Sequence, residues 1–238
     1  MSRNPMSRPT VSRRVALRRG GMLAAGLAGT LVAGCGLMDS QITTVATTPT
    51  SPSESARNTT TAPAANRTLL VYFSRSGENY YYGGRRDLEV GNTEVLASMI
   101  SELIDADVYQ IEAADPYPDS YDATVQRNVT EQDADARPVI ANPIDSIASY
   151  DVVLVGSPIW NVRPPMIMTT FAERYDFTGK QIHPFVTHAV SGLGSTQAVY
   201  TAAFPGARIG PGLAIQGEEV SQRRSDVDAW LGRVGLTS

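Results

Sequence analysis

The chain has 238 residues, of which 42% are hydrophobic, and its 20 Lys and Arg against 24 Asp and Glu give a formal net charge of −4. Residues 1–34 hold six arginines and no acidic residue, so the rest of the chain carries −4 − 6 = −10. This length predicts one core domain with an extension, and the acidic balance argues against nucleic acid and against adsorption to anionic lipid.

Residues 1–34 have the pattern of an export signal. An arginine-rich start is followed by an apolar run at residues 22–33 (MLAAGLAGTLVA), which has the length of a signal h-region and is too short to span a bilayer. Residues 12–17 (SRRVAL) resemble the twin-arginine signal, and residues 31–35 (LVAGC) resemble the lipobox of bacterial lipoproteins.

Cys35 ends that lipobox and is the only cysteine in the chain, so an internal disulfide is excluded. A lone cysteine is otherwise typical of a small buried hydrophobe. Its place directly after small residues at the end of an apolar run favours lipidation. We therefore expect an exported protein on the extracytoplasmic face of the bacterial cell membrane, in contact with the membrane only through an N-terminal lipid anchor.

Residues 35–67 predict a disordered tether, because they are rich in Thr, Ser, Ala and Pro and show no helical or strand period. A flexible tether of this kind reaches on the order of 30 Å. The remaining residues, 68–238, are expected to form the folded domain.

Within that domain, apolar runs and helical periods alternate. Strands are predicted at residues 68–73, 107–112, 151–157, 181–189 and 212–215, and helices at 93–104, 121–134, 164–175, 195–204 and 226–234. The runs TLLVYF and DVVLVGS are uninterrupted by charge beyond their first residue, which suits central strands covered on both faces. Alternation of this kind predicts an α/β fold with a doubly wound parallel sheet.

The loop after the first strand has the residues of a phosphate site. Ser74, Ser76 and Gly77 follow the strand, and Asn92 and Thr93 open the next helix, so hydroxyl and backbone N–H donors and a positive helix end are all near. Neither GxxxxGK[ST] nor GxGxxG occurs at this turn, which favours a single terminal phosphate. Ordinary turn and capping chemistry uses the same residues, and the loop alone leaves both interpretations open.

Ligands of doubly wound sheets bind beyond the carboxyl ends of the strands. Two further segments are expected there, residues 158–163 (PIWNVR), with an aromatic among turn-forming residues, and residues 187–194 (THAVSGLG). Together with the first loop they predict a site for a flat, phosphorylated heterocycle.

These motifs, YFSRSGENY…GNTE, DVVLVGSPIW, FTGKQIHPFVTHAVSGLG and GLAIQGEEV, resemble the flavodoxin-like family, in particular its branch with an extended phosphate loop. The resemblance implies a five-stranded parallel sheet in the order 2-1-3-4-5, helices on both faces, and bound FMN. The cofactor-binding residues that it implies are Ser74, Ser76, Gly77, Asn92 and Thr93 at the phosphate, Pro158, Ile159, Trp160 and Asn161 along the ring, and Thr187, His188, Ser191 and Gly192 on its other side. Glu218 is expected near the ring as well.

The chain departs from that branch in two places. Asn161 and Val162 stand where members often have a second tryptophan and a glycine, which bears on ring stacking and on the backbone contact to flavin N5. The insert at residues 80–91 begins with Tyr80, Tyr81 and Tyr82, which either roof the flavin or pack as an aromatic cluster under a long loop.

Other chemistry is not favoured. His183 and His188 are the only histidines and have no cysteine nearby, so no metal site is expected, and no GxSxG pattern predicts a hydrolase. We expect His183 to be structural, His188 to belong to the cofactor loop, and the charges of Arg163, Arg223, Arg224 and of residues 131–135 to be solvated. No catalytic side chain is predicted, because a flavin supplies its own chemistry.

The sequence therefore predicts an FMN-binding protein that acts in electron transfer or flavin-dependent reduction outside the cytoplasmic membrane, with a redox partner or small-molecule acceptor that it does not identify. Two alternatives stay open. One is an NAD(P)H-dependent reductase of quinones or other small acceptors, and the other is a flavin-free lipoprotein that binds a ligand or partner.

Overall fold

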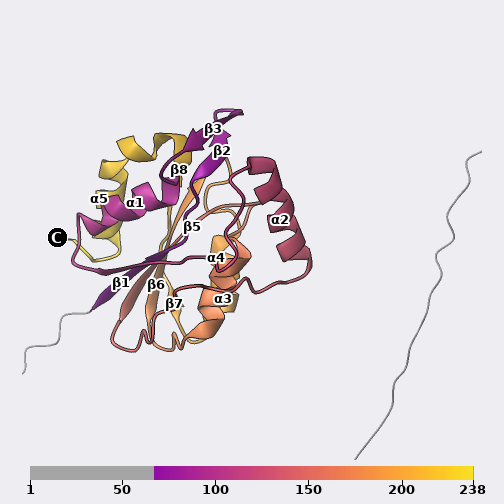
Figure 1. Cartoon of the computed structure of the whole chain (residues 1–238). Helices are drawn as coiled ribbons and strands as arrows, with labels where there is room; N and C mark the ends of the chain where they lie inside the picture. The colour runs from indigo at the N-terminus through magenta and orange to yellow at the C-terminus, as the bar shows by residue number, and fades with distance from the viewer. Residues whose placement is uncertain (1–66, 238) are drawn as a thin grey trace, which may run out of the picture. The chain divides into compact units, whose positions relative to one another are not determined.

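The structure, a computed structural model, describes residues 67–237 (Figure 1). The predicted export signal, Cys35 and all but the last residue of the predicted tether lie outside the described residues. None of the helices in residues 67–237 has the length and apolar character needed to cross a membrane.

The centre of the domain is a parallel sheet in the order β4-β1-β5-β6-β7, with β8 also paired to β6. Its strands are β1 (Thr68–Tyr72), β4 (Asp107–Gln110), β5 (Val152–Pro158), β6 (Gln181–His188), β7 (Arg208–Ile209) and β8 (Leu213–Gln216). Since β7 and β8 share the fifth position, the sheet has the predicted order 2-1-3-4-5, and the predicted fold class is confirmed.

The fifth position of the sheet differs from the prediction of a single strand at residues 212–215, because two short strands, β7 and β8, share it. β7 pairs with Gln181 and Ile182, whereas β8 pairs with the segment from Phe185 to His188. Gly210, Pro211 and Gly212 lie between the two pieces. Proline has no N–H to donate to a neighbouring strand, so the ladder is interrupted there.

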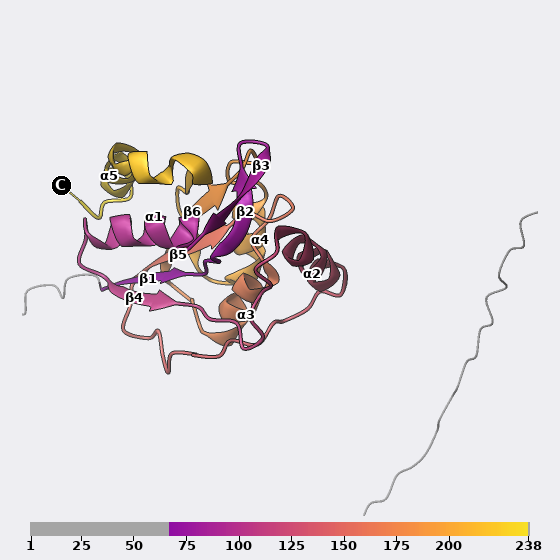
Figure 2. The same cartoon turned by 45° about the horizontal axis from the view of Figure 1, so that its top comes forward.

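In the part of the chain that the structure describes, helices cover both faces of the sheet, and α2 stands beside it (Figures 1 and 2). α1 (Asn92–Ser101) and α5 (Arg224–Arg233) lie on one face, and α3 (Met166–Arg174) and α4 (Thr196–Ala203) on the other. α2 (Tyr121–Asp133) packs near α3 and the strand β2. Each helix corresponds to one of the predicted helices, with ends shifted by a few residues.

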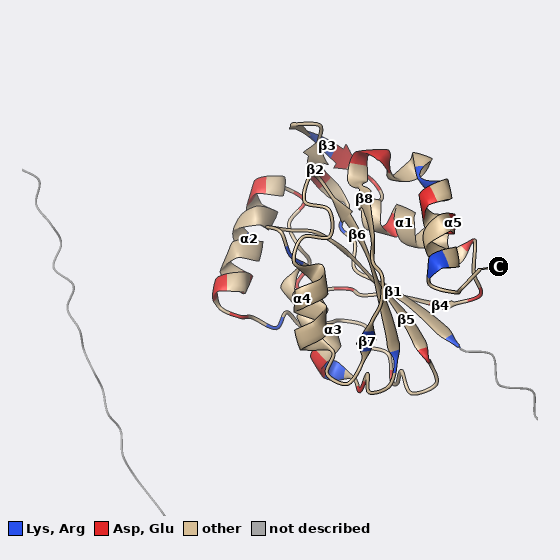
Figure 3. Cartoon of the chain, turned by 180° about the vertical axis from the view of Figure 1, so that it is seen from behind, with Lys and Arg blue, Asp and Glu red and all other residues tan. Residues whose placement is uncertain are grey.

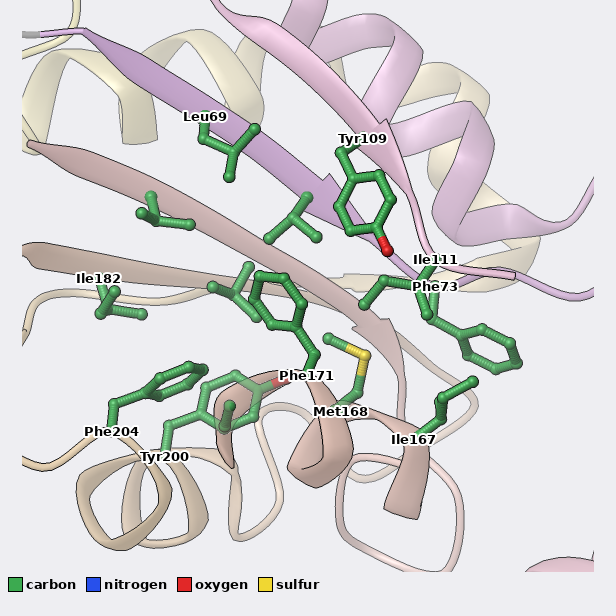
Figure 4. Close-up of a cluster of buried hydrophobic side chains, with 14 of the residues drawn as sticks. Leu69, Phe73, Tyr109, Ile111, Ile167, Met168, Phe171, Ile182, Tyr200 and Phe204 are labelled. Carbon is green, nitrogen blue, oxygen red and sulfur yellow. The ribbon is translucent and has the colours of Figure 1, made fainter. Parts of the chain in front are cut away.

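The core forms two clusters because successive side chains of a strand point to opposite faces. Leu69 and Val71 of β1 belong to the cluster under α3 and α4, together with Phe171 and Tyr200 (Figure 4). Leu70 and Tyr72 belong to the cluster under α1 and α5, which contains the fully buried Trp230. Burying one such side chain stabilises a fold by about 1.5–3 kcal/mol.

Charged residues lie on the helices and toward the ends of strands, and the middle of the sheet has none (Figure 3).

The insert at residues 80–91 is the main local difference from the expected loop. It lies largely in an antiparallel hairpin of β2 (Gly77–Tyr81) and β3 (Gly84–Leu88), which turns at Tyr82 and Gly83 with φ of 46° and 85°. Two residues at positive φ are typical of a tight hairpin turn.

Candidate functional site

A cleft of about 340 Å³ lies beyond the carboxyl ends of β1, β5 and β6. The β2–β3 hairpin and α2 are found at that end of the sheet (Figure 2). All three loops predicted to converge there contribute to its lining. The predicted site residues that line it are Ser74, Asn92, Thr93, Pro158, Ile159, Trp160, Asn161, Thr187 and His188. Ser76, Gly77, Ser191 and Gly192 do not line it, and Glu218 does.

The loop after β1 is joined tightly to the start of α1. The Ser74 Oγ accepts a hydrogen bond of 3.1 Å from the backbone N–H of Glu94. A Cβ on Gly91 would lie 2.3 Å from that Oγ and 2.5 Å from the carbonyl oxygen of Arg75, so only glycine fits here. This contact brings Ser74 and Asn92 to the same end of the cleft.

Arg75 holds the loop in place and was not anticipated from the sequence. Its Nη1 donates hydrogen bonds of 3.0 Å to the carbonyls of Pro118 and Asp119, and its Nη2 donates to the carbonyl of Glu78. Burial lowers the pKa of Arg75 from its ordinary value, and nearby acids, Asp119 first, raise it again. Gly77 packs against the same segment, because a Cβ there would lie 2.9 Å from the Asp119 carbonyl oxygen. Packing and a φ of 78° therefore explain why position 77 is a glycine.

Trp160 forms an aromatic wall of the cleft and is supported from behind. Its ring lies edge-on to Phe73 and Tyr117, with centroids 5.7 and 5.0 Å away. The Tyr117 hydroxyl donates a 2.8 Å hydrogen bond to Glu131, which also accepts one of 2.7 Å from Arg127 Nε. Burial, and next the bond to Glu131, raise the pKa of Tyr117.

The prediction that the charges of residues 131–135 are solvated is wrong for Glu131. Its acidic stretch was expected to be solvated, yet Glu131 is only 9% exposed. The prediction was wrong for this residue because a helical period cannot show that a tyrosine and an arginine will pair with a carboxylate on the inner face. Arg223 pairs with Glu219 and Asp226, and Arg224 with Glu102, so these exposed arginines are not free charges.

The segment after β5 turns sharply at Asn161 and Val162. Their φ values are 49° and 60°, and Trp160 and Arg163 exchange backbone hydrogen bonds of 2.9 and 3.3 Å across them. The Asn161 Nδ2 donates to Gln132 of α2 at 3.0 Å. Asparagine tolerates this backbone region, whereas a β-branched valine rarely adopts it.

The segments after β5 and β6 touch each other. The Val162 carbonyl accepts bonds from the Ser195 N–H at 2.8 Å and from the Ser195 Oγ at 3.0 Å. A Cβ on Gly194 would lie 2.3 Å from the same carbonyl oxygen. His188 completes this side of the cleft, and burial lowers its pKa, which favours the neutral imidazole.

The sequence did not indicate that α2 forms one side of the cleft. Its contribution is the set Tyr121, Thr124, Val125, Asn128 and Val129, joined from the first loop and hairpin by Arg75, Asn79 and Tyr80. The residues of α2 recur every three or four positions, and that spacing is the signal that marks a single helix face. Of the three tyrosines, Tyr80 lines the cleft, while Tyr81 and Tyr82 pack on each other with ring centroids 4.9 Å apart.

The chain is similar to known proteins in sequence and in fold. The family model described as flavodoxin matches residues 88–234, which is more than half of the chain. No curated protein matches the chain at a significant level.

Solved structures of similar fold include two proposed flavoproteins. The protein from Bacteroides uniformis ATCC 8492 is 27% identical, with a TM-score of 0.56, and the match covers 70% of this chain and 98% of that one. The protein from Bacteroides eggerthii DSM 20697 is 25% identical, with a TM-score of 0.58 and coverage of 73% and 100%. A flavoprotein from Lactobacillus acidophilus NCFM in complex with FMN is 20% identical, with a TM-score of 0.49 and coverage of 70% and 99%.

Proposed function

This chain belongs to the flavodoxin family, and from that premise we propose that its cleft binds FMN and that the protein acts in electron transfer or flavin-dependent reduction. The observation that carries the proposal is the meeting of three segments, those after β1, β5 and β6, at one cleft. When bound, FMN supplies the redox chemistry, since its ring accepts and returns electrons.

The residues present fit this cofactor. A cleft of about 340 Å³ is within the range of about 300–1,000 Å³ that is usual for small-molecule sites. At one end, Ser74, Asn92 and Thr93 offer polar groups beside the start of α1, where free backbone N–H groups favour a phosphate. At the other end, Trp160 supplies a flat wall and Tyr80 lies on the hairpin side.

The protein's own groups would then bind, orient and shield the cofactor. The Asn92 side chain packs closely against the backbone of Gly217, where a Cβ would lie 2.4 Å from the Asn92 Nδ2. The buried hydrogen bond between the Thr93 and Thr187 hydroxyls leaves one hydroxyl proton free to donate at the cleft. No side chain is required to transfer a proton in this proposal.

The direct test uses the full chain. We expect purified protein to show the absorption of oxidised flavin, or to gain it on addition of FMN. Gly91→Ala should weaken FMN binding by about tenfold or more, which is about 1.4 kcal/mol, because the new Cβ forces Ser74 and the Arg75 carbonyl apart. The matched control is Gly232→Ala on α5, where the nearest atom to a new Cβ is 3.7 Å away. A colourless protein that FMN does not convert would contradict the proposal.

The location of the protein is part of the same proposal. The signal at residues 1–34 and Cys35 support export and anchoring at the outer face of the membrane, and a twin-arginine route carries folded proteins, so FMN would be inserted before export. Cys35→Ala should abolish metabolic labelling with a fatty acid, while Ser40→Ala in the same segment should keep it. Continued labelling of the Cys35 variant would contradict lipidation at Cys35, because the fatty acid would then be attached at another residue.

A further inference from the structure

The β2–β3 hairpin is inserted into the loop that is proposed to bind the phosphate. β2 begins directly after residues 74–76, and the chain passes from β3 through residues 89–91 to Asn92. Arg75 of this loop donates a hydrogen bond to the Glu78 carbonyl of β2. Both strands of the hairpin therefore continue into residues at the phosphate end of the cleft, and a displacement of the hairpin would move them.

The base of the hairpin is held on the side of α2 by several contacts. The Glu78 N–H donates a 2.8 Å hydrogen bond to the Asp119 carbonyl, and the Glu78 Oε2 accepts one of 3.0 Å from the Tyr121 N–H. The Arg85 guanidinium lies over the Tyr121 ring, 3.6 Å from its centroid. Backbone, carboxylate and cation–π contacts thus fix this side of the hairpin to the start of α2.

The turn of the hairpin is held on the opposite side of the cleft by one carboxylate. The Tyr82 N–H donates a 3.0 Å hydrogen bond to the Oε1 of Glu218, in the 3-10 helix η1 (Gly217–Gln222). Within residues 67–237, this is the only hydrogen bond or ion pair between the hairpin and η1. The hairpin accordingly stands between α2 and the segment that leads into α5 (Figures 1 and 2).

The character of this bond suits a structural role. A backbone N–H in the middle of a turn has no partner in the strand ladder, so it requires an acceptor from elsewhere. A hydrogen bond to an ionised acceptor is about twice as strong as one between neutral groups. One carboxylate can therefore hold a turn whose other neighbours do not bond to it.

The charge of Glu218 is otherwise out of place. Glu218 lines the cleft, and the preceding Gly217 packs on Asn92, where a Cβ would lie 2.4 Å from the Asn92 Nδ2. A carboxylate beside the residues proposed for a phosphate repels that phosphate. Its presence there is explained if its main role is to bind the hairpin and not the ligand.

We infer that Glu218 is a positioning residue for the phosphate end of the cleft: it holds the turn of the β2–β3 hairpin, and the hairpin in turn fixes the two halves of the phosphate loop. The inference rests on the proposed FMN function. It assigns the effect of Glu218 to the phosphate of the ligand and not to its ring.

FMN and riboflavin, which has the same ring but no phosphate, separate these effects. Both are titrated into the flavin-free full-length protein by fluorescence. In Glu218→Ala, the ratio of FMN affinity to riboflavin affinity should fall about tenfold. Glu218→Gln keeps an oxygen that accepts the Tyr82 N–H and removes the charge, so it should bind FMN as tightly as the wild type or more tightly.

The matched control is Glu219→Ala, which removes the neighbouring acid. Glu219 pairs with Arg223 and does not line the cleft, so the affinity ratio should stay at the wild-type value. Equal weakening of FMN and riboflavin by Glu218→Ala would overturn the inference, because Glu218 would then act on the ring. Unchanged or tighter FMN binding by Glu218→Ala would overturn it as well, because charge would then outweigh positioning.

Failure of the proposed function is a separate result. If the wild type does not bind FMN, the flavin proposal fails. Hydrogen exchange of the Tyr82 amide in the flavin-free protein still tests the bond: exchange should be slow in the wild type and in Glu218→Gln and faster in Glu218→Ala. Equal exchange in the wild type and Glu218→Ala would overturn the inference whether or not FMN binds.

Discussion

The hydroxyl oxygen of Thr93, in the first turn of α1, lies 2.7 Å from the hydroxyl oxygen of Thr187, near the end of β6. The two residues are 1% and 4% exposed, and both line the cleft. One hydroxyl donates to the other, and the acceptor keeps its own proton free to donate elsewhere. This bond therefore joins the start of α1 to the end of β6 and leaves a donor for a ligand.

Thr187→Val should destabilise the domain by about 1–3 kcal/mol, because it leaves the buried Thr93 hydroxyl without its partner. The double variant Thr93→Val/Thr187→Val should lose less than the sum of the two single changes, since no polar group is then left alone. Urea denaturation measures all three. Thr201→Val, on the exposed surface of α4, is the control, and strictly additive losses at positions 93 and 187 would show that the hydroxyls do not interact.

Tyr117→Phe should lower the free energy of unfolding by about 1–3 kcal/mol, because the buried carboxylate of Glu131 loses one of its two donors. The ring itself is kept, so packing against Trp160 is preserved. The control is Tyr150→Phe, whose hydroxyl donates a 2.8 Å bond to the exposed Asp107 and should matter far less. Equal losses in the two variants, measured by urea denaturation, would show that burial at Glu131 gives that bond no added strength.

Elements with strong local patterns were predictable from the sequence. β1 and β5 are continuous apolar runs of strand length, and such runs are typical of parallel strands buried on both faces. The sheet order followed from the resemblance to flavodoxins, and the meeting of three loops followed from the rule that parallel strands end at one edge.

What the sequence did not predict depends on contacts between distant segments. β3 has the sequence GRRDL and is mostly exposed, so it has no apolar alternation that would mark a strand. β3 is a strand because it pairs with β2, and its own sequence does not show this. Glu131 and the cleft-facing side of α2 were missed for a related reason, because a helical period shows that a helix has an inner face but not what that face meets.

Val162→Gly should stabilise the domain by about 1 kcal/mol, because glycine adopts a φ near 60° without the strain that a β-branched side chain meets there. Little packing is lost, since Val162 is 59% exposed. The control is Val139→Gly, at an exposed position that is not among those with positive φ, where added chain entropy should destabilise. Thermal unfolding of the two variants should shift in opposite directions, and a shared loss would mean that the turn stores no strain.

The stability of the domain should fall as the pH drops through the range where His183 titrates. His183 is 5% exposed in β6 and faces Gly210, where a Cβ would lie 2.3 Å from the imidazole Cε1. Burial lowers its pKa, so the folded protein keeps it neutral at a pH where the unfolded chain, with an ordinary pKa of about 6.5, takes up a proton.

Because the unfolded state then binds more protons, the free energy of unfolding decreases below about pH 6.5, by at most about 1.4 kcal/mol per pH unit for one group. The variant His183→Leu lacks this titrating group. When the pH is lowered from about 7.5 to about 5.5, its free energy of unfolding should therefore decrease by less than that of the wild type. His188→Leu provides the comparison, since His188 is only half-buried and should contribute less. Urea midpoints at the two pH values measure the difference, and an identical pH dependence in wild type and His183→Leu would assign the acid sensitivity to other groups.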